Sequence, residues 1–420
     1  MVFSCLALIA AFSTNAQQPQ QTPPPAPAPI IKANVNEVMV SVVVRDAQGH
    51  AVGTLAKEDF QVFDNGKLQP LVSFTLVRRS AAATAANAAT PNPPAAASPD
   101  AKQPESQLQR FVIFVFDDVN LSISDLPQVQ QAATKALDAT LSFSDIAAVL
   151  ATSGTNSGLT RDRATLKQAI MSLRVSYLLH DSGHECPNMS YYQGDLIVNK
   201  NDSMALAAAT QETMTCAKIS VPEMATSIAQ QAARRAVALG EQNYRTCLGF
   251  LRSVVGKMAP LPGQHVVILV SPGFLTPDAA AMNLTSELLD MAAQSNVIIN
   301  ALDARGLYTT NMDASQQGGG SPMAAQVQNR YRQDSMRSSE DIMAELADGT
   351  GGTFVHSSND LVSGLGNLIA GPEYLYLLSF STANIKANGA YHSLKVKVSQ
   401  PNMNIQARHG YFAPAAEKKK

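Results

Sequence analysis

Two adjacent aspartates follow a run of six apolar residues, a position typical of residues that do chemistry. The sequence reads FVIFVF over 111–116 and continues with Asp117 and Asp118, after which Asn120 and Ser122 follow at every second position. Carboxylate, amide and hydroxyl oxygens are hard ligands for Mg²⁺, and ligands of open α/β sheets bind where the strands end. The same pattern is also typical of a strand that turns into a helix, with Asp118 as the N-cap.

The segment 109–371 alternates apolar strands with helical patterns. FVIFVF, DIAAVLAT, VVILVS and NVIINALD read as buried strands, and the stretches between them carry helix signals. This alternation predicts a mostly parallel sheet with helices on both faces, a Rossmann-like α/β fold. A long helix is expected over 222–258 unless Gly240 breaks it. Inside the domain we expect an insertion at 176–220 and a polar surface loop at 309–336.

Two flanking segments, 35–78 and 372–413, read as β-structure. VMVSVVV, FQVF, YLYLLSFS and KVKVS are β-branched or alternate apolar with polar residues, and AQG and DNG are turn signals. Neither segment is large enough to bury a core alone. We therefore predict that they pack together as one β-sandwich-like module, with the α/β domain inserted between them.

The remaining segments predict an exported chain. Residues 1–16 form an apolar run ending in Thr-Asn-Ala, which resembles a secretory signal peptide and its cleavage site. A Pro/Gln-rich linker at 17–34, an Ala/Pro-rich linker at 79–108 and a lysine-rich tail at 414–420 complete the organisation. After the signal peptide no segment is long and apolar enough to cross a bilayer. We expect a secreted or periplasmic protein.

Composition excludes one class of partner. The formal net charge is −2, and the chain has no Trp and 6% aromatic residues. Nucleic-acid binding proteins usually show a basic footprint or an aromatic stacking platform, and neither is present in this composition. We expect no nucleic-acid partner.

The cysteines predict one disulfide. In an oxidising compartment Cys186 and Cys216 form the favoured pair, because together they would staple the insertion. His184, Glu185 and Cys186 are also metal-ligand types, but neighbours in sequence rarely point at one ion, so we favour the disulfide over zinc. Cys247 lies in a helical pattern of apolar residues and reads as buried packing.

Signatures of catalysis are absent from the sequence. It contains no G-x-S-x-G, no H-E-x-x-H, no P-loop and no G-x-G-x-x-G after a strand, so no enzyme class is indicated. Asp303 and Arg305 follow the strand NVIINAL, at the sheet edge where ligands usually bind. With Asp117 they form a possible ligand edge, although a salt bridge within the turn is the favoured reading of Asp303 and Arg305.

Several blocks in order resemble a von Willebrand factor A (VWA) domain, and more closely the VWFA-related proteins described from acidobacteria. The blocks are VVVRDAQGHAV with EDFQVFDNGK, RFVIFVFDD, LPGQHVVILVSPGF, NVIINALDARGL and KVKVSQPNMNIQARHGYF, spread over residues 35–413. The resemblance implies a Rossmann-like VWA fold, an exported location and binding rather than catalysis. VWA domains hold Mg²⁺ at a metal-ion-dependent adhesion site, which consists of an Asp-x-Ser-x-Ser loop, a Thr and a later Asp.

The resemblance maps this metal site onto the chain incompletely. Asp118, Asn120 and Ser122 match the first loop, with Asn120 in place of a Ser, whereas starting from Asp117 would put a Leu at the fifth position. The later Asp falls within Ser271-Pro272-Gly273, where Pro272 supplies no carboxylate. The site Thr would lie in the insertion, with three candidates left open: Thr210, Thr213 and Thr215. Mg²⁺ would therefore be held weakly at Asp118, Asn120, Ser122 and Ser271.

Two functions follow as expectations. The first is an exported, non-catalytic VWA-domain protein that binds another protein or a cell-envelope component through a degenerate adhesion site. The alternative is a structural or assembly scaffold of the cell envelope that works without metal. The sequence names neither the partner nor the oligomeric state.

Overall fold

The computed structural model describes residues 37–48, 50–78, 109–175, 186–306, 322–383 and 390–413. The predictions for the signal peptide, both linkers and the tail lie outside these residues, as do His184 and Glu185. Within the described part, no helix is both long enough and apolar enough to cross a membrane.

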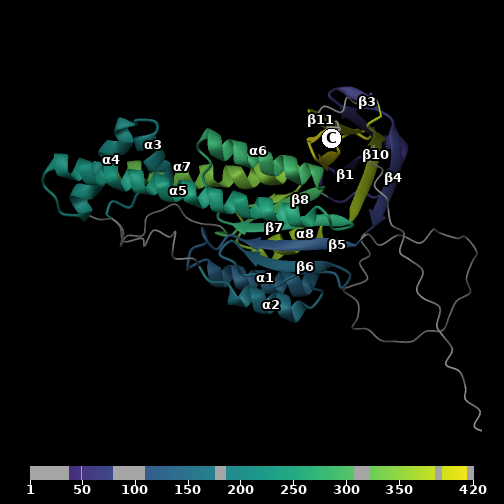
Figure 1. Cartoon of the computed structure of the whole chain (residues 1–420), viewed down its shortest axis with the longest axis horizontal. Coiled ribbons are helices and arrows are strands. Elements are labelled where there is room, and N and C mark those ends of the chain that lie inside the picture. The colour runs from purple at the N-terminus through teal and green to yellow at the C-terminus, as the bar shows by residue number, and fades with distance from the viewer. Residues whose placement is uncertain are drawn as a thin grey trace, which may run out of the picture. The chain divides into compact units, whose positions relative to one another are not determined.

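A five-stranded parallel sheet forms the centre of the α/β domain, and its strand order is β6-β5-β7-β8-β9 (Figure 1). Its strands are the apolar runs found in the sequence: β5 (Arg110–Phe116), β6 (Ile146–Ala151), β7 (Gln264–Ser271), β8 (Val297–Asp303) and β9 (Phe354–Val355). Each residue of β5 is buried, which is expected for a central strand covered on both faces. This confirms the predicted α/β fold with a parallel sheet.

Alternate residues of β5 face two different helical layers. Val112, Phe114 and Phe116 belong to one apolar cluster with α1, α2 and α8, whereas Phe111, Ile113 and Val115 belong to a second cluster with α5, α6 and α7. The alternation follows from the period of two in a strand. The helices are α1 (Leu126–Thr140), α2 (Arg163–Ser172), α5 (Pro222–Met258), α6 (Ala279–Gln294), α7 (Pro322–Thr350) and α8 (Leu361–Ala370).

The long helix α5 runs through Gly240 without a break. Gly240 is buried, and a Cβ built there would lie 2.1 Å from ring atoms of Tyr191, so glycine is needed for close approach of α3 (Tyr191–Val198) rather than for a kink. The disulfide between Cys186 and Cys216 is present, as predicted. The described part of the insertion contains two helices, α3 and α4 (Ser203–Cys216).

The expected loop at 309–336 is wrong in its second half, because residues 322–336 belong to α7. Pro322 stands at the beginning of that helix, where its missing N–H costs nothing, and Met, Ala, Gln and Arg are good helix formers. Polar composition alone suggested a loop, but it is equally compatible with a half-exposed helix.

The two flanking segments pair with each other in two four-stranded antiparallel sheets. One sheet has the order β12-β1-β10-β4 and the other β13-β11-β2-β3, so each contains strands from both ends of the chain. The strands are β1 (Glu37–Arg45), β2 (Phe60–Asp64), β3 (Lys67–Gln69), β4 (Leu71–Arg78), β10 (Tyr374–Ser381), β11 (Tyr391–Val398), β12 (Asn404–Ala407) and β13 (Gly410–Phe412). A 3-10 turn at Lys57–Asp59 precedes β2.

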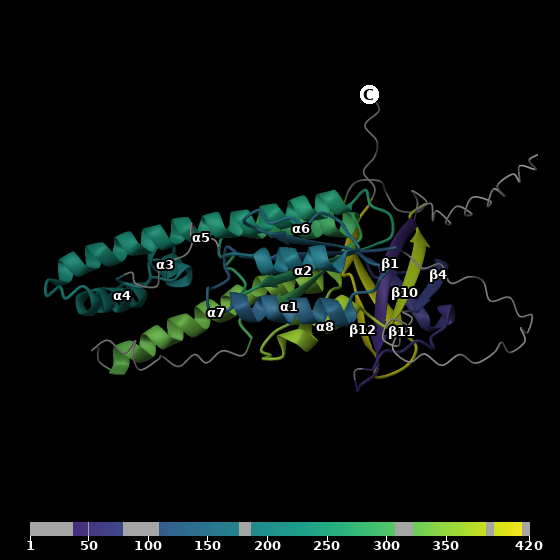
Figure 2. The ribbon, with the colours of Figure 1, turned by 90° about the horizontal axis from the view of Figure 1, so that it is seen from below.

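One apolar cluster is shared by both sheets, and it includes Val40, Phe60, Tyr376, Phe380 and Leu394. The sheet containing β1, β10 and β4 is also visible in Figure 2, where these strands lie side by side. We call the two sheets together the β-module. The β-module and the α/β domain belong to one compact unit of the chain.

Candidate functional site

Polar residues gather at the carboxyl edge of the parallel sheet, because neighbouring parallel strands end on the same side. Asp117 and Asp118 follow β5, Thr152 and Ser153 follow β6, and Ser271 ends β7. Both aspartate side chains are fully buried, with 0% exposure. A buried carboxylate needs hydrogen-bond donors, so the identity of those donors decides what the edge can do.

Asp117 accepts hydrogen bonds from three side chains. Ser271 Oγ lies 2.6 Å from Oδ2, Asn120 Nδ2 lies 2.9 Å from Oδ2, and Cys247 Sγ lies 3.2 Å from Oδ1. Burial raises the pKa of Asp117 above its ordinary value, and the bonds from Ser271, Asn120 and Cys247 oppose that rise. The carboxyl group is therefore enclosed by the protein's own donors.

Cys247 is a polar partner in this network as well as a packed residue of α5. Its thiol faces Asp117, and its sulfur also lies 3.3 Å from Asn120 Nδ2. Burial raises the pKa of the Cys247 thiol well above its usual value, and the nearby Asp117 carboxylate raises it further. The thiol consequently stays protonated at neutral pH and donates to Asp117.

Asp118 faces the end of the neighbouring strand β6. It accepts from Thr152 Oγ1 at 2.7 Å, from the backbone N–H of Ser153 at 2.9 Å, and from the Ser153 hydroxyl. It does not cap the following helix, since the N-cap of α1 is Asp125, whose side chain makes no capping bond. The capping interpretation of Asp118 is therefore wrong, although Asp118 does satisfy a loop amide.

Ser122, the third residue of the predicted metal loop, points to different partners again. Its Oγ lies 2.7 Å from Ser124 Oγ and accepts from the backbone N–H of Asp125 at 3.1 Å. Asp118, Asn120 and Ser122 thus turn toward β6, toward Asp117 and toward their own loop, respectively. The structure does not bring these three residues together around one point.

This arrangement does not fit Mg²⁺, which requires oxygen lone pairs converging in near-octahedral geometry. The Asp117 carboxylate instead accepts hydrogen bonds from a thiol, an amide NH₂ and a hydroxyl. Over the ranges that the structure describes, no group of three or more His, Cys, Asp or Glu residues is placed to hold a metal ion.

The turn after β7 packs tightly against the backbone of α7. Ser271 Oγ donates to Asp117 and accepts from the backbone N–H of Gly273 at 2.9 Å. Gly273 has a φ of +83°, and a Cβ built on it would lie 2.0 Å from the carbonyl oxygen of Ser339 in α7. Only glycine fits this position, both for its left-handed backbone and for the close approach of the helix. Pro272 lies in the same turn.

Asp303 and Arg305 form a salt bridge within their turn, which confirms the interpretation that the sequence favoured. Arg305 Nε lies 2.9 Å from Asp303 Oδ1, and its guanidinium also lies 2.9 Å from Asp303 Oδ2 and from Glu340 Oε1. Asp303 is 2% exposed. The pair therefore joins the end of β8 to α7 instead of offering its charges to solvent.

The three threonine candidates for the metal site lie on α4 and are engaged there. Thr210 bonds Thr226 at the beginning of α5, while Thr213 and Thr215 donate to carbonyl oxygens of their own helix. Thr226 precedes Asn243, an α5 residue that contacts Asn120, by 17 residues, or about 25 Å along the helix axis at 1.5 Å per residue. The threonine at the carboxyl edge is Thr152 instead.

The sequence did not identify four residues that take part in the hydrogen bonds at the carboxyl edge: Thr152, Ser153, Asn243 and Cys247. The first two had a usable signal, since they directly follow the strand DIAAVLA, which neighbours β5 in the sheet. Asn243 Nδ2 lies 3.4 Å from Asn120 Oδ1, and its own Oδ1 is buried without a hydrogen-bond partner in the described part of the chain. Nothing local marks this helix face as polar.

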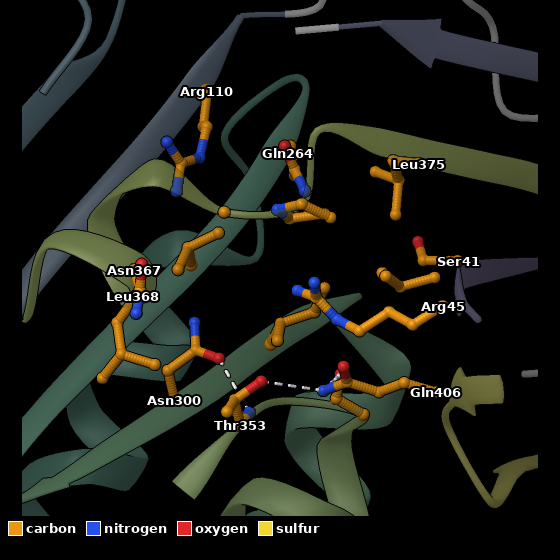
Figure 3. Close-up of a pocket in the computed structure, with 16 residues that line it drawn as sticks. Ser41, Arg45, Arg110, Gln264, Asn300, Thr353, Asn367, Leu368, Leu375 and Gln406 are labelled. Atoms are coloured by element: carbon orange, nitrogen blue, oxygen red, sulfur yellow. Dashed lines mark hydrogen bonds between the residues drawn. The ribbon is translucent and has the colours of Figure 1, made fainter. Parts of the chain in front are cut away.

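A second polar region lies at the opposite, amino edge of the sheet, against the β-module. A cavity of about 60 Å³ is lined there by side chains from both parts, and Figure 3 shows Arg45 pointing into it from β1 and Arg110 facing it from β5. Gln406 of β12 bonds the carbonyl of Gly351 at 3.0 Å and Thr353 Oγ1 at 3.1 Å, and it also bonds the carbonyl of Gly352. A wider groove of about 510 Å³ adjoins the cavity and shares Arg45 and Gln406.

Comparisons with known proteins add little to this geometry. No known protein-family profile matches the chain, and no curated protein matches it. Among solved structures, the N-terminal domain of TFIIH p34 is similar with 13% sequence identity and a TM-score of 0.23. The alignment covers 62% of this chain and 97% of that one. A likeness at this TM-score carries no argument about fold or function.

Proposed function

We propose that this chain is an exported, non-catalytic VWA-class protein that binds another protein or a cell-envelope component without a metal bridge. One observation carries the proposal. Asp117 and Asp118, the residues best suited to metal binding or acid–base chemistry, are fully buried and saturated by internal donors. A carboxylate in that state supports the sheet edge and is not offered to a ligand.

The β-sheets at the chain ends belong to this proposal as a β-sandwich-like module. Their shared apolar cluster and interleaved strands support that packing. Recognition is then assigned to surfaces outside the carboxyl edge. The apolar run at residues 1–16 is the basis for export.

Calorimetric titration tests the metal-independent part of the proposal. Mg²⁺ and Mn²⁺ are titrated into the purified protein and into Asp118→Ala. We expect no saturable heat from either protein, because Asp117 and Asp118 are both fully buried and hydrogen-bonded to donors of the protein itself. Saturable binding by the wild type that is lost in Asp118→Ala would contradict the proposal and restore a metal-bridged adhesion site.

Co-sedimentation with isolated cell envelopes tests the binding role. We expect saturable sedimentation that unlabelled protein competes away and that EDTA leaves unchanged. A protein that stays in the supernatant at all concentrations contradicts envelope binding. Cell fractionation with and without residues 1–16 tests export, which predicts loss of the secreted or periplasmic pool on deletion.

A further inference from the structure

One edge strand of the β-module differs from the other edges of the molecule. The sheets of the described chain end in β12 and β4, in β13 and β3, and in β6 and β9. Four of these strands are short, with four residues in β12, three in β13, three in β3 and two in β9. The outer edge of β6 is covered, since Ala147 and Leu150 form antiparallel bridges with Thr160 and Asn156.

β4 is the exception, with eight residues, LVSFTLVR. Within the described chain it pairs with β10 alone, so its other side presents a row of backbone N–H and C=O groups. Natural edge strands are usually protected against pairing with another chain because they are short, contain Lys, Pro or a bulge, or are covered by another segment. β4 contains no Lys and no Pro, and its register shift against β10 lies at its beginning, opposite Ser379 and Phe380.

The backbone direction of this edge can be assigned. The N–H of Ser73 bonds Ser379 Oγ of β10 at 3.1 Å, so it points inward. Because successive N–H groups alternate along a strand, those of Phe74 and Leu76 point to the outer edge. These are the groups that a further strand would bond.

The side chains along the edge are apolar and incompletely covered. Val72 is 50% exposed, and Phe74 and Leu76 are half-buried. Phe74 belongs to an aromatic group with Phe60 and Tyr376, with both ring centroids 5.9 Å away. An added strand would bury the remaining face of this group, which favours pairing.

We propose that β4 pairs antiparallel with β4 of a second copy of this chain, which joins two of the β12-β1-β10-β4 sheets into one continuous sheet. The residues from Leu71 to Val77 carry no charge, so the two copies meet no like-charge contact along the strand. Arg78 is the single charged residue, and a twofold axis places the two copies of Arg78 at opposite ends of the pair. Residues 79–108, which follow in sequence, are rich in Ala and Pro and are poor strand formers.

The twofold axis restricts the register. Residues opposite each other in an antiparallel pair must both face the partner strand or both face away from it. Self-pairing therefore always sets one residue opposite its own copy. If that residue is Thr75, the two side chains form a non-hydrogen-bonded pair with a Cα separation of about 4.5 Å, within the range that a disulfide bridges.

The first experiment measures oligomeric state by analytical ultracentrifugation across protein concentrations. We expect a monomer–dimer equilibrium that weakens at least tenfold in Thr75→Lys, because an edge lysine blocks strand addition. The matched control is Gln61→Lys, an exposed position on β2, which lies between β11 and β3 and has no open edge. Circular dichroism checks that both variants keep the fold. A monomer at all concentrations, or a dimer unaffected by Thr75→Lys, overturns the proposal.

Cysteine cross-linking tests the pairing directly. Ser73→Cys, Phe74→Cys and Thr75→Cys are oxidised separately, with Gln61→Cys as the control. The described part of the chain has one free thiol, Cys247, and because it is buried we expect it to contribute little background cross-linking. We expect a disulfide-linked dimer that forms strongly at one of the three positions and not at Gln61. Equal cross-linking at Gln61 and on β4 contradicts a specific register.

Discussion

The two edges of the parallel sheet use polar residues in opposite ways. At the carboxyl edge, Asp117 and Asp118 have no solvent exposure and are enclosed by hydroxyl, amide and thiol donors. At the amino edge, a cavity of about 60 Å³ and an adjoining groove of about 510 Å³ are lined by Arg45 and Gln406 among others, against the β-module. The two aspartates, which the sequence marks as the best candidates for chemistry, are therefore enclosed structural residues. The cavity and the groove lie at the amino edge, where the sequence carries no motif.

The difference shows that residue type is a poor guide to function without the partners. A carboxylate at the end of a strand is a ligand when its lone pairs are free, and a structural acceptor when donors of the same chain fill them. If the carboxyl edge is structural, substitutions there should lower stability more than substitutions where the amino edge meets the β-module.

The largest effect is expected at Gly273, where the turn of the carboxyl edge passes under α7. Gly273→Ala places a Cβ 2.0 Å from the Ser339 carbonyl oxygen, so the free energy of unfolding should fall by about 3 kcal/mol or more. The matched control is Gly66→Ala, since Gly66 has a similar φ of +77° but nothing within 4 Å of a Cβ. Urea unfolding should give only about 1 kcal/mol for the control. Equal losses would mean that contact with α7 is unimportant.

A second large effect is expected from Asp118→Ala. The substitution leaves the Thr152 hydroxyl and the Ser153 N–H and hydroxyl without their acceptor, at a cost of about 2–4 kcal/mol. Asp125→Ala is the control, because the Asp125 side chain makes no capping bond to α1. Chemical denaturation of both variants measures the difference. A neutral Asp118→Ala would show that this residue is not structural and would reopen its role as a ligand.

The pH dependence of stability should carry the signature of Asp117. Burial raises the pKa of Asp117 in the folded state above the ordinary value of 3.8, so the folded protein holds a proton that the unfolded chain releases. This stabilisation is complete below pH 3.8 and is lost as pH rises through the raised pKa. The slope is at most about 1.4 kcal/mol per pH unit.

Asp117→Asn isolates this contribution, because the amide does not titrate. The stability of the wild type relative to Asp117→Asn should fall as pH rises from 3.8 upward, measured by urea unfolding at each pH. A relative stability that stays flat or increases with pH would mean that Asp117 is not held in a charge-excluding environment.

The smallest effect is expected at the amino edge. Gln406→Ala removes bonds to the loop before β9, and a cost of about 1 kcal/mol is expected because that contact is partly solvated. Asn404→Ala, an exposed neighbour on β12, is the control and should be close to neutral. Thermal unfolding measures both, and a loss in Gln406→Ala as large as that in Asp118→Ala would remove the contrast between the two edges.

Local patterns in the sequence were sufficient for most of the fold. The apolar runs predicted β5 to β8, and the helical spacing of apolar residues predicted α5. The β-branched flanking segments predicted strands in both sheets of the β-module. These features depend on periods of 2.0 and 3.6 residues, which are visible over a few neighbouring positions. The Cys186–Cys216 disulfide followed from the export prediction and from the insertion that the pair closes.

Tertiary structure decided the site. Asp117 meets Cys247 and Ser271 across 130 and 154 residues of sequence, and Asp118 meets Ser153 across 35. No local period encodes such contacts, because they depend on which strands are neighbours and which helix face passes the edge. For the same reason Thr152 lies beside Asp118, whereas Thr210, Thr213 and Thr215 remain on a helix elsewhere. The sequence by itself determined where the carboxylates stand along the chain, and only the packed structure determined that donors, rather than an open ligand site, surround them.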